Sequence, residues 1–321
     1  MPLTAIQSLE AQHIGVAIVS YNTADLLRAC LQSLADCTVD VGVVVVDNGS
    51  TDESVAMMAR EFPLVTVLVP GENLGFARGT NLAMRRLLAD APALQYVLML
   101  NPDTVVHAGA LEELLAFVVA HPRVGVVSPR LVNPDGSLQR GVFRFPTPLM
   151  TLFDLFPPGE VLPGRFYDSW WHGRYPQEAA GAAPFAVDHP LGAAMLTRVS
   201  LLQTVGMLDE DYFMYVEEVD WCMRVRRAGW AIWQQPAAVI THVGGASSRQ
   251  FRAAMTLALW RSRMRYWQRW ATARELWWHR FFLRMGLWRM RIVATTACRR
   301  GVLSAAHEAE LQAVYRTLSM L

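Results

Sequence analysis

Short apolar runs rich in valine and isoleucine alternate with longer amphipathic stretches over the first 130 residues. The runs are apolar at nearly every position, so both faces of each predicted strand must be covered. Strands of this kind that alternate with helices predict an α/β fold, with a mostly parallel sheet flanked by helices. The predicted strands are IGVAIVS (14–20), VGVVVVD (41–47), VTVLVP (65–70), YVLMLN (96–101) and VGVVSP (124–129), and the predicted helices are 24–34, 54–61, 77–88 and 109–119.

Polar residues follow each of the first four predicted strands. In open α/β sheets ligands bind beyond the carboxyl ends of the strands, so these residues are candidates for a site. Any one group is also ordinary turn or capping chemistry, but four successive strand ends favour a common site. The residues are Ser20, Tyr21 and Asn22, then Asp47, Asn48, Gly49, Ser50, Thr51 and Asp52, then Asn73, Gly75, Arg78 and Asn81, then Asn101, Pro102 and Asp103.

The remainder of the chain changes character twice. The turn NPDG (133–136) and the SLQRGVFRF that follows predict a hairpin, and the Pro-, Gly- and aromatic-rich segment 146–186 predicts a long surface loop. A helix from near Val199, another within 212–230 and two short strands, WAIWQQ and AAVITH, come next. Residues 249–321 predict helices, so we expect one domain over 1–248 and a helical C-terminal region over 249–321.

Charge is distributed unevenly. The chain has 53% hydrophobic residues and a net charge of +1, which is typical of a globular protein and argues against a whole-chain nucleic-acid binder. All 29 basic residues are arginines, and thirteen of them lie between Arg249 and Arg300, where Glu275 is the only acid. The last quarter of the chain therefore differs in kind from the rest.

Cysteine usage and hydropathy indicate the compartment. Cys30, Cys37, Cys222 and Cys298 show no C-x-x-C spacing, which favours a reducing environment over a disulfide scaffold or structural zinc. The first residues do not resemble a signal peptide, and arginines interrupt every run that approaches the roughly 20 apolar residues of a spanning helix. We expect a cytoplasmic protein, or one peripheral on the inner face of the cell membrane.

Five motifs together resemble the family 2 glycosyltransferases, an inverting family with the fold called GT-A. They are VSYN (19–22), VDNGSTD (46–52), NLGFARGTN (73–81), LNPD (100–103) and FMYVEEVDWCMRVRRAGW (213–230), and the resemblance covers about residues 14–245. The VDNGSTD and LNPD variants look like the bacterial rhamnosyltransferase-like subgroup. The resemblance implies a nucleotide-sugar half over about 14–130 and an acceptor half over about 131–248.

The resemblance also implies how a nucleoside-diphosphate sugar is bound. Asp47 matches the acid that accepts a hydrogen bond from the base, with Tyr21 packing nearby. Asp103 matches the last acid of the D-x-D motif, which holds Mg²⁺ or Mn²⁺ against the diphosphate. Asn101 replaces the first acid, keeping an oxygen but losing a charge. The expected donor-binding set is Ser20, Tyr21, Asn22, Asp47, Asn73, Arg78 and Asn101.

Transfer requires a base for the acceptor hydroxyl, and a carboxylate is the usual choice. The segment Glu217, Glu218, Val219, Asp220 matches the family's E-D-x-D, and Glu218 takes the position of the base. Glu217 and Asp220 are expected on the acceptor side, although acids at a helix N-terminus are also favourable with the helix dipole. The stretch 190–198 resembles a stretch of the family that borders the acceptor side, and Gly192 and Ala193 are expected to allow close approach there.

Two further residue types are candidates for the diphosphate. His242, at the end of AAVITH, matches a histidine that related transferases use as a second metal ligand, whereas a lone histidine is more often a satisfied polar residue. Arg78 and Arg249 are candidates for contact with phosphate oxygens through the guanidinium fork.

The C-terminal region interleaves six tryptophans with arginines between Trp260 and Trp288. This pattern on helices suits an anionic membrane surface, and a packed helical subdomain or a dimer interface remains the alternative. A membrane location would favour a glycan or polyprenyl-diphosphate-linked saccharide as acceptor, in assembly of cell-surface polysaccharide.

Other functions fit the sequence less well. A nucleotidyltransferase needs a glycine-rich phosphate loop near the first strand, and a dinucleotide dehydrogenase needs G-x-G-x-x-G there; neither is present. A catalytically silent GT-A-fold carbohydrate-binding or scaffold protein stays open as the alternative. For an active enzyme, the resemblance of VDNGSTD and LNPD to the rhamnosyltransferase-like subgroup implies deoxythymidine-diphosphate rhamnose as the first expected donor, and the resemblance to the family implies inversion by single displacement.

Overall fold

The computed structural model describes residues 3–9, 13–156, 169–181, 183–244 and 252–320. The chain divides into two compact units. The first comprises residues 1–144, 177–213 and 217–247, and the second comprises residues 145–176, 214–216 and 248–321. Among the described helices, none combines the length and the apolarity needed to cross a membrane.

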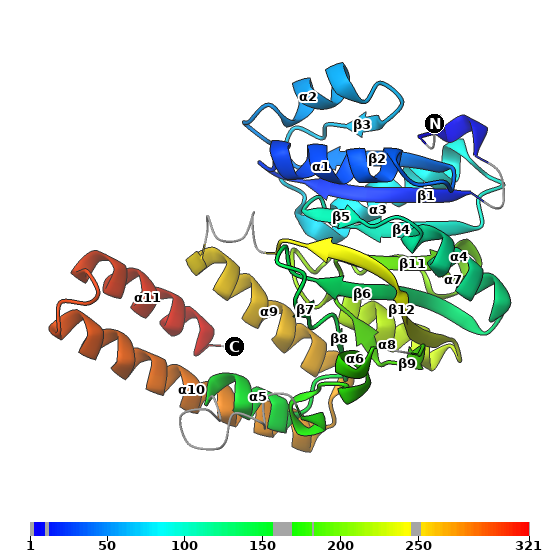
Figure 1. Cartoon of the computed structure of the whole chain (residues 1–321). Coiled ribbons are helices and arrows are strands. Elements are labelled where there is room, and N and C mark those ends of the chain that lie inside the picture. Colours follow the sequence, from blue (N-terminus) through cyan, green and yellow to red (C-terminus); the bar gives the residue numbers. More distant parts are fainter. Residues whose placement is uncertain (1–2, 10–12, 157–168, 182, 245–251, 321) are drawn as a thin grey trace. The chain divides into compact units, whose positions relative to one another are not determined.

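The first unit is built on a mixed sheet (Figure 1). Along the sheet the strands run β3-β2-β1-β4-β11-β6-β12-β5, with β7 added beside β6 and β9 beside β12. A separate pair joins β8 and β10. The strands are β1 (Ile14–Ser20), β2 (Val41–Asp47), β3 (Thr66–Leu68), β4 (Tyr96–Leu100), β5 (Thr104–Val106), β6 (Val124–Val132), β7 (Leu138–Gln139), β8 (Val142–Phe143), β9 (Phe185–Ala186), β10 (His189–Pro190), β11 (Ala194–Arg198) and β12 (Ala231–His242).

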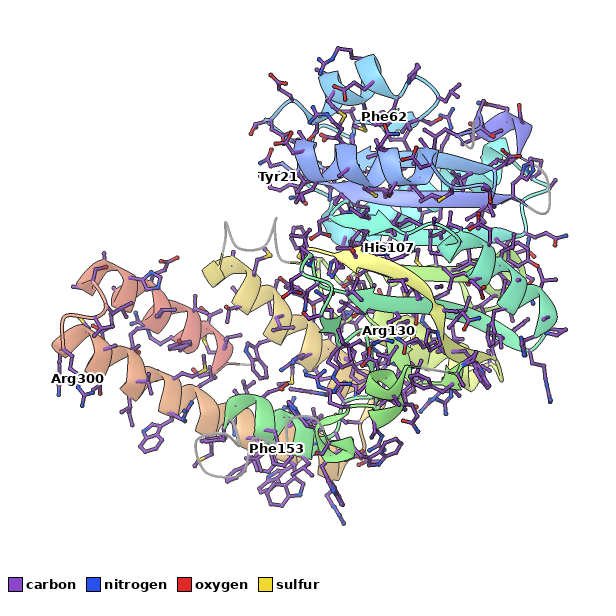
Figure 2. All side chains as sticks on the ribbon, viewed as in Figure 1. Tyr21, Phe62, His107, Arg130, Phe153 and Arg300 are labelled. Carbon is purple, nitrogen blue, oxygen red and sulfur yellow. The ribbon has the colours of Figure 1, made fainter. Side chains whose placement is uncertain are left out.

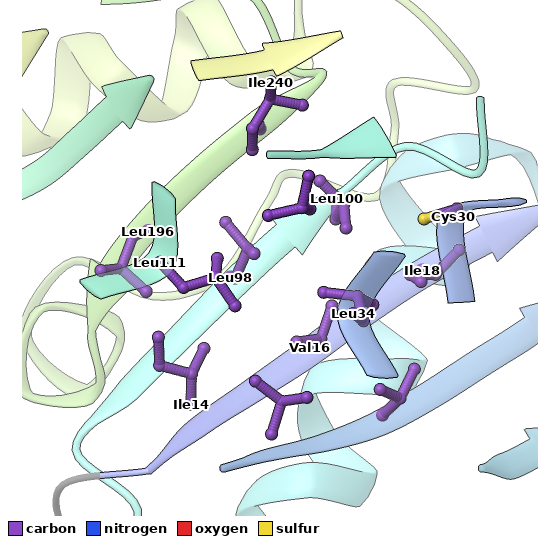
Figure 3. Close-up of a cluster of buried hydrophobic side chains, with 14 of the residues drawn as sticks. Ile14, Val16, Ile18, Cys30, Leu34, Leu98, Leu100, Leu111, Leu196 and Ile240 are labelled. Carbon is purple, nitrogen blue, oxygen red and sulfur yellow. The ribbon is translucent and has the colours of Figure 1, made fainter. Parts of the chain in front are cut away.

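Helices cover both faces of this sheet, as the continuous apolar runs predict. They are η1 (Ile6–Ser8), α1 (Ala24–Ala35), α2 (Ser54–Glu61), α3 (Gly75–Asp90), α4 (Ala110–Ala120), α6 (Pro176–Ala180), α7 (Val199–Val205) and α8 (Glu217–Arg227). On one face, Val16 and Ile18 of β1 pack with Leu34 of α1 in the core (Figure 3). On the other face, Gly15 leaves room for Leu87 of α3, because a Cβ at Gly15 would lie 3.1 Å from a methyl carbon of Leu87. The predicted α/β class is confirmed.

The sheet is not purely parallel: β5 and β9 run antiparallel to β12, and β7 runs antiparallel to β6. β3, β2, β1 and β4 are parallel, but β11 runs antiparallel to both β4 and β6. The segments WAIWQQ and AAVITH, predicted as two short strands, form the single strand β12, whose register against β6 shifts between Gln235 and Val239. Pro236 lies in that shift, since proline has no N–H for the ladder. The predicted hairpin after residue 132 is confirmed, because β6 and β7 pair across NPDG.

The second unit is helical over its described residues. Its elements are α5 (Pro148–Leu155), η4 (Trp170–His172), α9 (Arg252–Trp270), α10 (Ala273–Arg299) and α11 (Ala305–Leu318). The interpretation of 146–186 as a surface loop was wrong for α5. Thr147 accepts the Met150 N–H as an N-cap and Pro148 occupies the first turn, so polar and proline residues that resembled a loop start a helix.

Packing of α5 against α10 explains why α5 is ordered. Leu155 fills the space over Gly286, where an added Cβ would lie 2.6 Å from a Leu155 methyl carbon. Thr151 hydrogen-bonds His279 Nδ1 at 2.8 Å, and the Trp267 ring stacks on His279 with centroids 4.0 Å apart. Burial lowers the pKa of His279 to about 4, so this histidine is a neutral core residue at physiological pH.

Gly75 provides a direct test of the first unit. It begins α3 with a φ of +78°, and an added Cβ would lie 2.3 Å from the Phe213 carbonyl oxygen, which accepts the Phe76 N–H. Gly75→Ala should therefore lower the free energy of unfolding by about 2 kcal/mol or more, from backbone strain and from the lost approach of two backbone segments.

The matched control is Gly109→Ala. Gly109 also has a positive φ, +81°, but nothing lies within 4 Å of an added Cβ, so only strain of about 1 kcal/mol is expected. Urea denaturation of both variants measures the difference. Equal losses would show that the contact with Phe213 contributes nothing.

Candidate functional site

Pairing between strands brings the predicted strand-end residues to one edge of the sheet. Ser20 is opposite Asp47 in the parallel pair β1–β2, and Ile18 is opposite Leu100 in the pair β1–β4. The Asn48 N–H donates to the Ser20 carbonyl oxygen at 2.8 Å, so the alignment continues past the strand ends. The residues that follow these three strands consequently share one edge.

One carboxylate oxygen of Asp47 is an unused hydrogen-bond acceptor. Its side chain is buried, and its Oδ1 accepts the Ser50 N–H at 2.9 Å. Its Oδ2 is buried with no hydrogen-bond partner within the described part of the chain. A buried carboxylate oxygen without a donor is costly, and an imide N–H of a pyrimidine base would satisfy it.

The loops after β1 and β2 hold each other in place. Asn22 adopts a left-handed φ of 51°, which asparagine tolerates, and its Oδ1 accepts the Thr51 N–H at 2.7 Å. In return the Asn22 N–H donates to Ser50 Oγ at 2.9 Å. Ser20 Oγ hydrogen-bonds Thr23 Oγ1 at 2.9 Å. Half-buried Tyr21 lies between Ser20 and Asn22, beyond the end of β1 (Figure 2).

Polar residues at the third strand end hold the start of α3 in place. Asn73 Oδ1 accepts the Gly75 N–H at 2.9 Å, and the buried Asn48 donates to the Gly75 carbonyl oxygen at 3.0 Å. Arg78 lies on the exposed side of α3, with its Nε 3.8 Å from Glu210 Oε2. These contacts shape the loop, and no described contact joins Arg78 to Asp103. Arg249, the other predicted phosphate contact, lies outside the described residues.

The two predicted metal ligands meet, although they are far apart in the sequence. β5 and β12 pair antiparallel with His242 opposite Thr104, and the Val243 N–H donates to the Asp103 carbonyl oxygen at 3.0 Å. This pairing places His242 Nε2 3.3 Å from Asp103 Oδ1. Asn101 Nδ2 lies 3.4 Å from the same His242 nitrogen.

Gln139 of β7 was not predicted as part of the site, yet its hydrogen bonds orient the His242 ring. Its Nε2 donates to two oxygens, the His242 carbonyl and Asn133 Oδ1, both at 3.0 Å. The amide is thereby oriented so that Gln139 Oε1 faces His242 Nδ1 at 2.7 Å. Because that oxygen only accepts, the hydrogen bond favours a proton on Nδ1, which would leave Nε2 as the nitrogen able to bind a cation beside Asp103.

The side chains of Asp103 and His242 are suited to bind a divalent cation that a phosphate group also binds. One carboxylate and one imidazole nitrogen converge, and within the described residues no group of three His, Cys, Asp or Glu side chains could hold a metal. Mg²⁺ and Mn²⁺ are commonly held by one or two protein ligands plus substrate phosphates and water. Asp103 and His242 could therefore hold such an ion once a diphosphate completes the site.

The acceptor-side residues reach the same edge through β11. The Asn101 N–H donates to the Ala193 carbonyl oxygen at 2.9 Å, which continues the antiparallel pairing of β4 and β11. Next to Ala193, Gly192 lies against Glu218, since a Cβ at Gly192 would be 3.8 Å from the Glu218 carboxyl carbon. The predicted base thus lies against Gly192, the residue before the Ala193 whose carbonyl oxygen binds the Asn101 N–H.

Backbone strain precedes the predicted base. Tyr215 and Val216 adopt φ values of 69° and 71°, and the left-handed region is unfavourable for a β-branched residue such as Val216. Glu217 and Glu218 follow at the start of α8. Strained backbone of this kind persists where surrounding contacts hold it, and it is frequent at functional sites.

The other two acids of the motif are in different surroundings. Burial, and secondly the negative charge of Glu218, raise the pKa of Glu217 well above its usual range. Asp220 is buried and pairs with Arg224 Nε at 3.0 Å. Arg224 in turn donates to the carbonyl oxygens of Val205 and Met207, each at 2.8 Å. The contacts of Asp220 thus anchor α8 to the end of α7.

An α/β sheet of this order, with acids at successive strand ends and an Asp–His pair beside them, defines a glycosyltransferase of the GT-A kind. The chain belongs to glycosyl transferase family 2, whose model matches residues 15–205.

Individual proteins resemble the chain in sequence and in structure. An N-acetylglucosaminyl-diphospho-decaprenol L-rhamnosyltransferase of Mycobacterium tuberculosis is 32% identical over 238 residues, covering 71% of this chain and 75% of that protein. The low-salt glycan biosynthesis hexosyltransferase Agl10 of Haloferax volcanii is 28% identical over 222 residues, covering 69% of this chain and 64% of that protein. A Pyrobaculum calidifontis mannosyltransferase, solved with GDP-Man and Mn²⁺, has a TM-score of 0.53 at 17% identity, covers 99% of this chain and 89% of its own, and supports the fold.

Gln139 can be tested by metal binding alone. Gln139→Leu removes the acceptor for His242 Nδ1–H, so the tautomer with a bare Nε2 loses its stabilisation. Mn²⁺ affinity, measured by calorimetry in the presence of a nucleoside diphosphate, should fall about 10- to 100-fold.

Gln235→Leu is the matched control, since Gln235 is a partly buried glutamine of β12 whose side chain bonds Glu113 instead. It should leave Mn²⁺ affinity unchanged. If the Gln139→Leu protein binds Mn²⁺ as tightly as the unaltered chain, Gln139 does not position His242 for metal binding.

Proposed function

We propose that the chain transfers a sugar with inversion from a nucleoside-diphosphate donor, first of all rhamnose from deoxythymidine-diphosphate rhamnose, to a hydroxyl of a glycan or a polyprenyl-diphosphate-linked saccharide. The observation that carries the proposal is the meeting of Asp103 and His242 at 3.3 Å, on the edge that also bears Asp47. The rhamnosyltransferase of M. tuberculosis supports the choice of sugar and of a lipid-linked acceptor.

Donor binding follows from the charges at the edge. Asp47 Oδ2 would accept the imide N–H of the base, and Tyr21 would pack beside it. Asp103 and His242 would hold Mg²⁺ or Mn²⁺, which neutralises charge on the departing diphosphate. Asn101 would add an amide oxygen or nitrogen to the same region, and Arg78 a guanidinium reaching the outer phosphate. Ser20, Asn22 and Asn73 would keep the surrounding loops in shape through the hydrogen bonds described above.

Transfer itself requires only one proton acceptor on the protein. Glu218 would take the proton of the acceptor hydroxyl as its oxygen attacks the anomeric carbon, and the bond to the diphosphate breaks on the opposite side. Gly192 and Ala193 would admit the acceptor close to Glu218, because neither carries a bulky side chain. Glu217 and Asp220 complete the acceptor side, Asp220 through its ion pair with Arg224.

The proposed domain organisation assigns these tasks along the chain. Residues 14–130 would bind the nucleotide sugar, residues 131–248 the acceptor, and residues 249–321 would form a helical region at the membrane surface. A lipid-linked acceptor favours action at the inner face of the cell membrane, in assembly of cell-surface polysaccharide.

The base assignment is tested by comparing adjacent glutamates. Glu218→Gln removes the proton acceptor, so kcat should fall about 100- to 10,000-fold while donor affinity stays nearly constant. Glu217→Gln is the control, because the raised pKa of Glu217 favours the protonated form, which glutamine resembles in shape and charge. Product formation by both variants, with donor affinity from calorimetry, measures this. A Glu218→Gln protein with near-native kcat would eliminate Glu218 as the base.

The metal and donor assignments are tested together by nucleotide binding. With Mg²⁺ or Mn²⁺ present, thermal shift should show stabilisation by deoxythymidine diphosphate and its rhamnose ester more than by uridine or guanosine diphosphates, and chelation should abolish it. Asp103→Ala should lose the metal-dependent shift and reduce kcat/KM about 1,000-fold or more, whereas Asp25→Ala, which removes an exposed carboxylate of α1, should change neither. Indifference to every nucleotide would favour the silent carbohydrate-binding or scaffold alternative.

A further inference from the structure

Five of the six tryptophans of the C-terminal region fall into two groups, and the sixth, Trp270, is half-buried. Trp260 and Trp267 of α9 are buried in the core of the second unit. Trp277, Trp278 and Trp288 of α10 are exposed, and Trp288 has 63% of its surface open to solvent. Packing inside the unit therefore explains Trp260 and Trp267 of α9 but leaves the tryptophans of α10 without an internal role.

Five of the seven large apolar residues exposed on α10 lie along one line of the helix. Steps of four, four, three and four residues connect Trp277, Phe281, Met285, Trp288 and Ile292, which we call the α10 outer face. Steps of three and four keep side chains on one side of a helix, and this line extends for about 22 Å. The residues buried on α10 are His279, Leu283, Gly286, Leu287 and Ala294.

Aromatic rings make part of the outer face a continuous platform. The rings of Trp277 and Phe281 stack with centroids 5.4 Å apart and an interplanar angle of 5°. Trp278 contacts the edge of Trp277 at 4.7 Å between centroids. These rings contact one another while remaining open to solvent, which is unusual for so much apolar surface unless a partner covers it.

Basic residues dominate the charge along this helix. Arg274 and Arg284 are exposed, and Glu275 is the only acid of α10. The Glu275 carboxylate is committed to the N-terminus of α10, where it accepts the Thr272 N–H at 2.9 Å in a capping box. Whatever covers the outer face must therefore accept exposed tryptophans, aliphatic side chains and uncompensated arginines together.

We propose that the α10 outer face lies in the interface of an anionic lipid bilayer, with α10 parallel to the membrane plane. Indole rings favour headgroup depth, aliphatic side chains favour the acyl boundary, and guanidinium groups pair with lipid phosphates. A second copy of the chain fits less well, since two such faces would oppose arginines with arginines. Nucleic acid would satisfy the arginines but offers no apolar phase for Met285 and Ile292.

This inference rests on the proposed function in one respect: membrane binding would bring the enzyme to a lipid-linked acceptor.

The experiment is a flotation assay of the full chain with vesicles of phosphatidylglycerol and phosphatidylcholine, and with vesicles of phosphatidylcholine alone. Binding is expected to the anionic vesicles and to weaken with salt. Trp277→Ala with Trp288→Ala should reduce the partition coefficient about tenfold or more, and Arg274→Gln with Arg284→Gln should remove most of the preference for anionic lipid.

Trp171→Ala is the matched control, because Trp171 is exposed to 62% in the same unit but is not on α10. It should bind vesicles like the unaltered chain. Equal loss from Trp171→Ala and Trp288→Ala, or no loss from the α10 variants, would overturn the proposal. So would a dimer in light scattering, or a complex with RNA in gel shift, that the α10 variants abolish while vesicle binding is absent.

Nucleotide binding separates this inference from the proposed function. The α10 variants should keep the metal-dependent thermal shift by the nucleoside diphosphate, since they are far in sequence from Asp47 and Asp103. Vesicle binding without any nucleotide response would sink the proposed function alone. A nucleotide response without vesicle binding would sink the membrane inference alone.

Discussion

Backbone pairing of β4 with β1 on one side and β11 on the other is the constraint on which the site depends. β1 fixes the end of β4 beside Ser20 and Asp47, and β11 continues the ladder past the strand end, from Ala193 to Asn101. Gly192, which lies against Glu218, directly precedes the Ala193 that Asn101 binds. Since the buried core beneath these strands is closely packed, the geometry of the edge is inherited from the sheet (Figure 3).

Sequence patterns predict the sheet better than they predict its connections. Continuous apolar runs identify strands covered on both faces, and parallel pairing then places Asp47 and Asp103 at one edge. The same runs carry no information on direction, because an antiparallel strand such as β11 buried on both faces is equally apolar. The meeting of Asp103 with His242 was implied by family resemblance alone, because the pairing of β5 with β12 joins residues far apart in the chain.

Residues that act through others are the ones that sequence reasoning misses. Gln139 lies in a two-residue strand of an ordinary hairpin, and its importance is visible only once His242 is known to lie opposite its amide. The prediction of a loop over 146–186 is wrong for α5 for a related reason. Its prolines and glycines are typical of loops, but the apolar side of α5 is explained by a partner, α10, that is more than 100 residues away in the chain. The tryptophans of α9 and α10 likewise look alike until burial separates them.

Asp47 gives the physical reason to regard the site as working and not as a relic. A buried carboxylate oxygen without a donor costs about 1–3 kcal/mol, and the Asp47 Oδ2 has no partner within the described chain. Only Oδ1 is used to bind the Ser50 N–H, so the loop itself makes no use of Oδ2. The excess acceptor is therefore useful only when a ligand supplies the donor. We propose that the imide N–H of the nucleotide base is this donor, which a scaffold that binds no ligand would not supply.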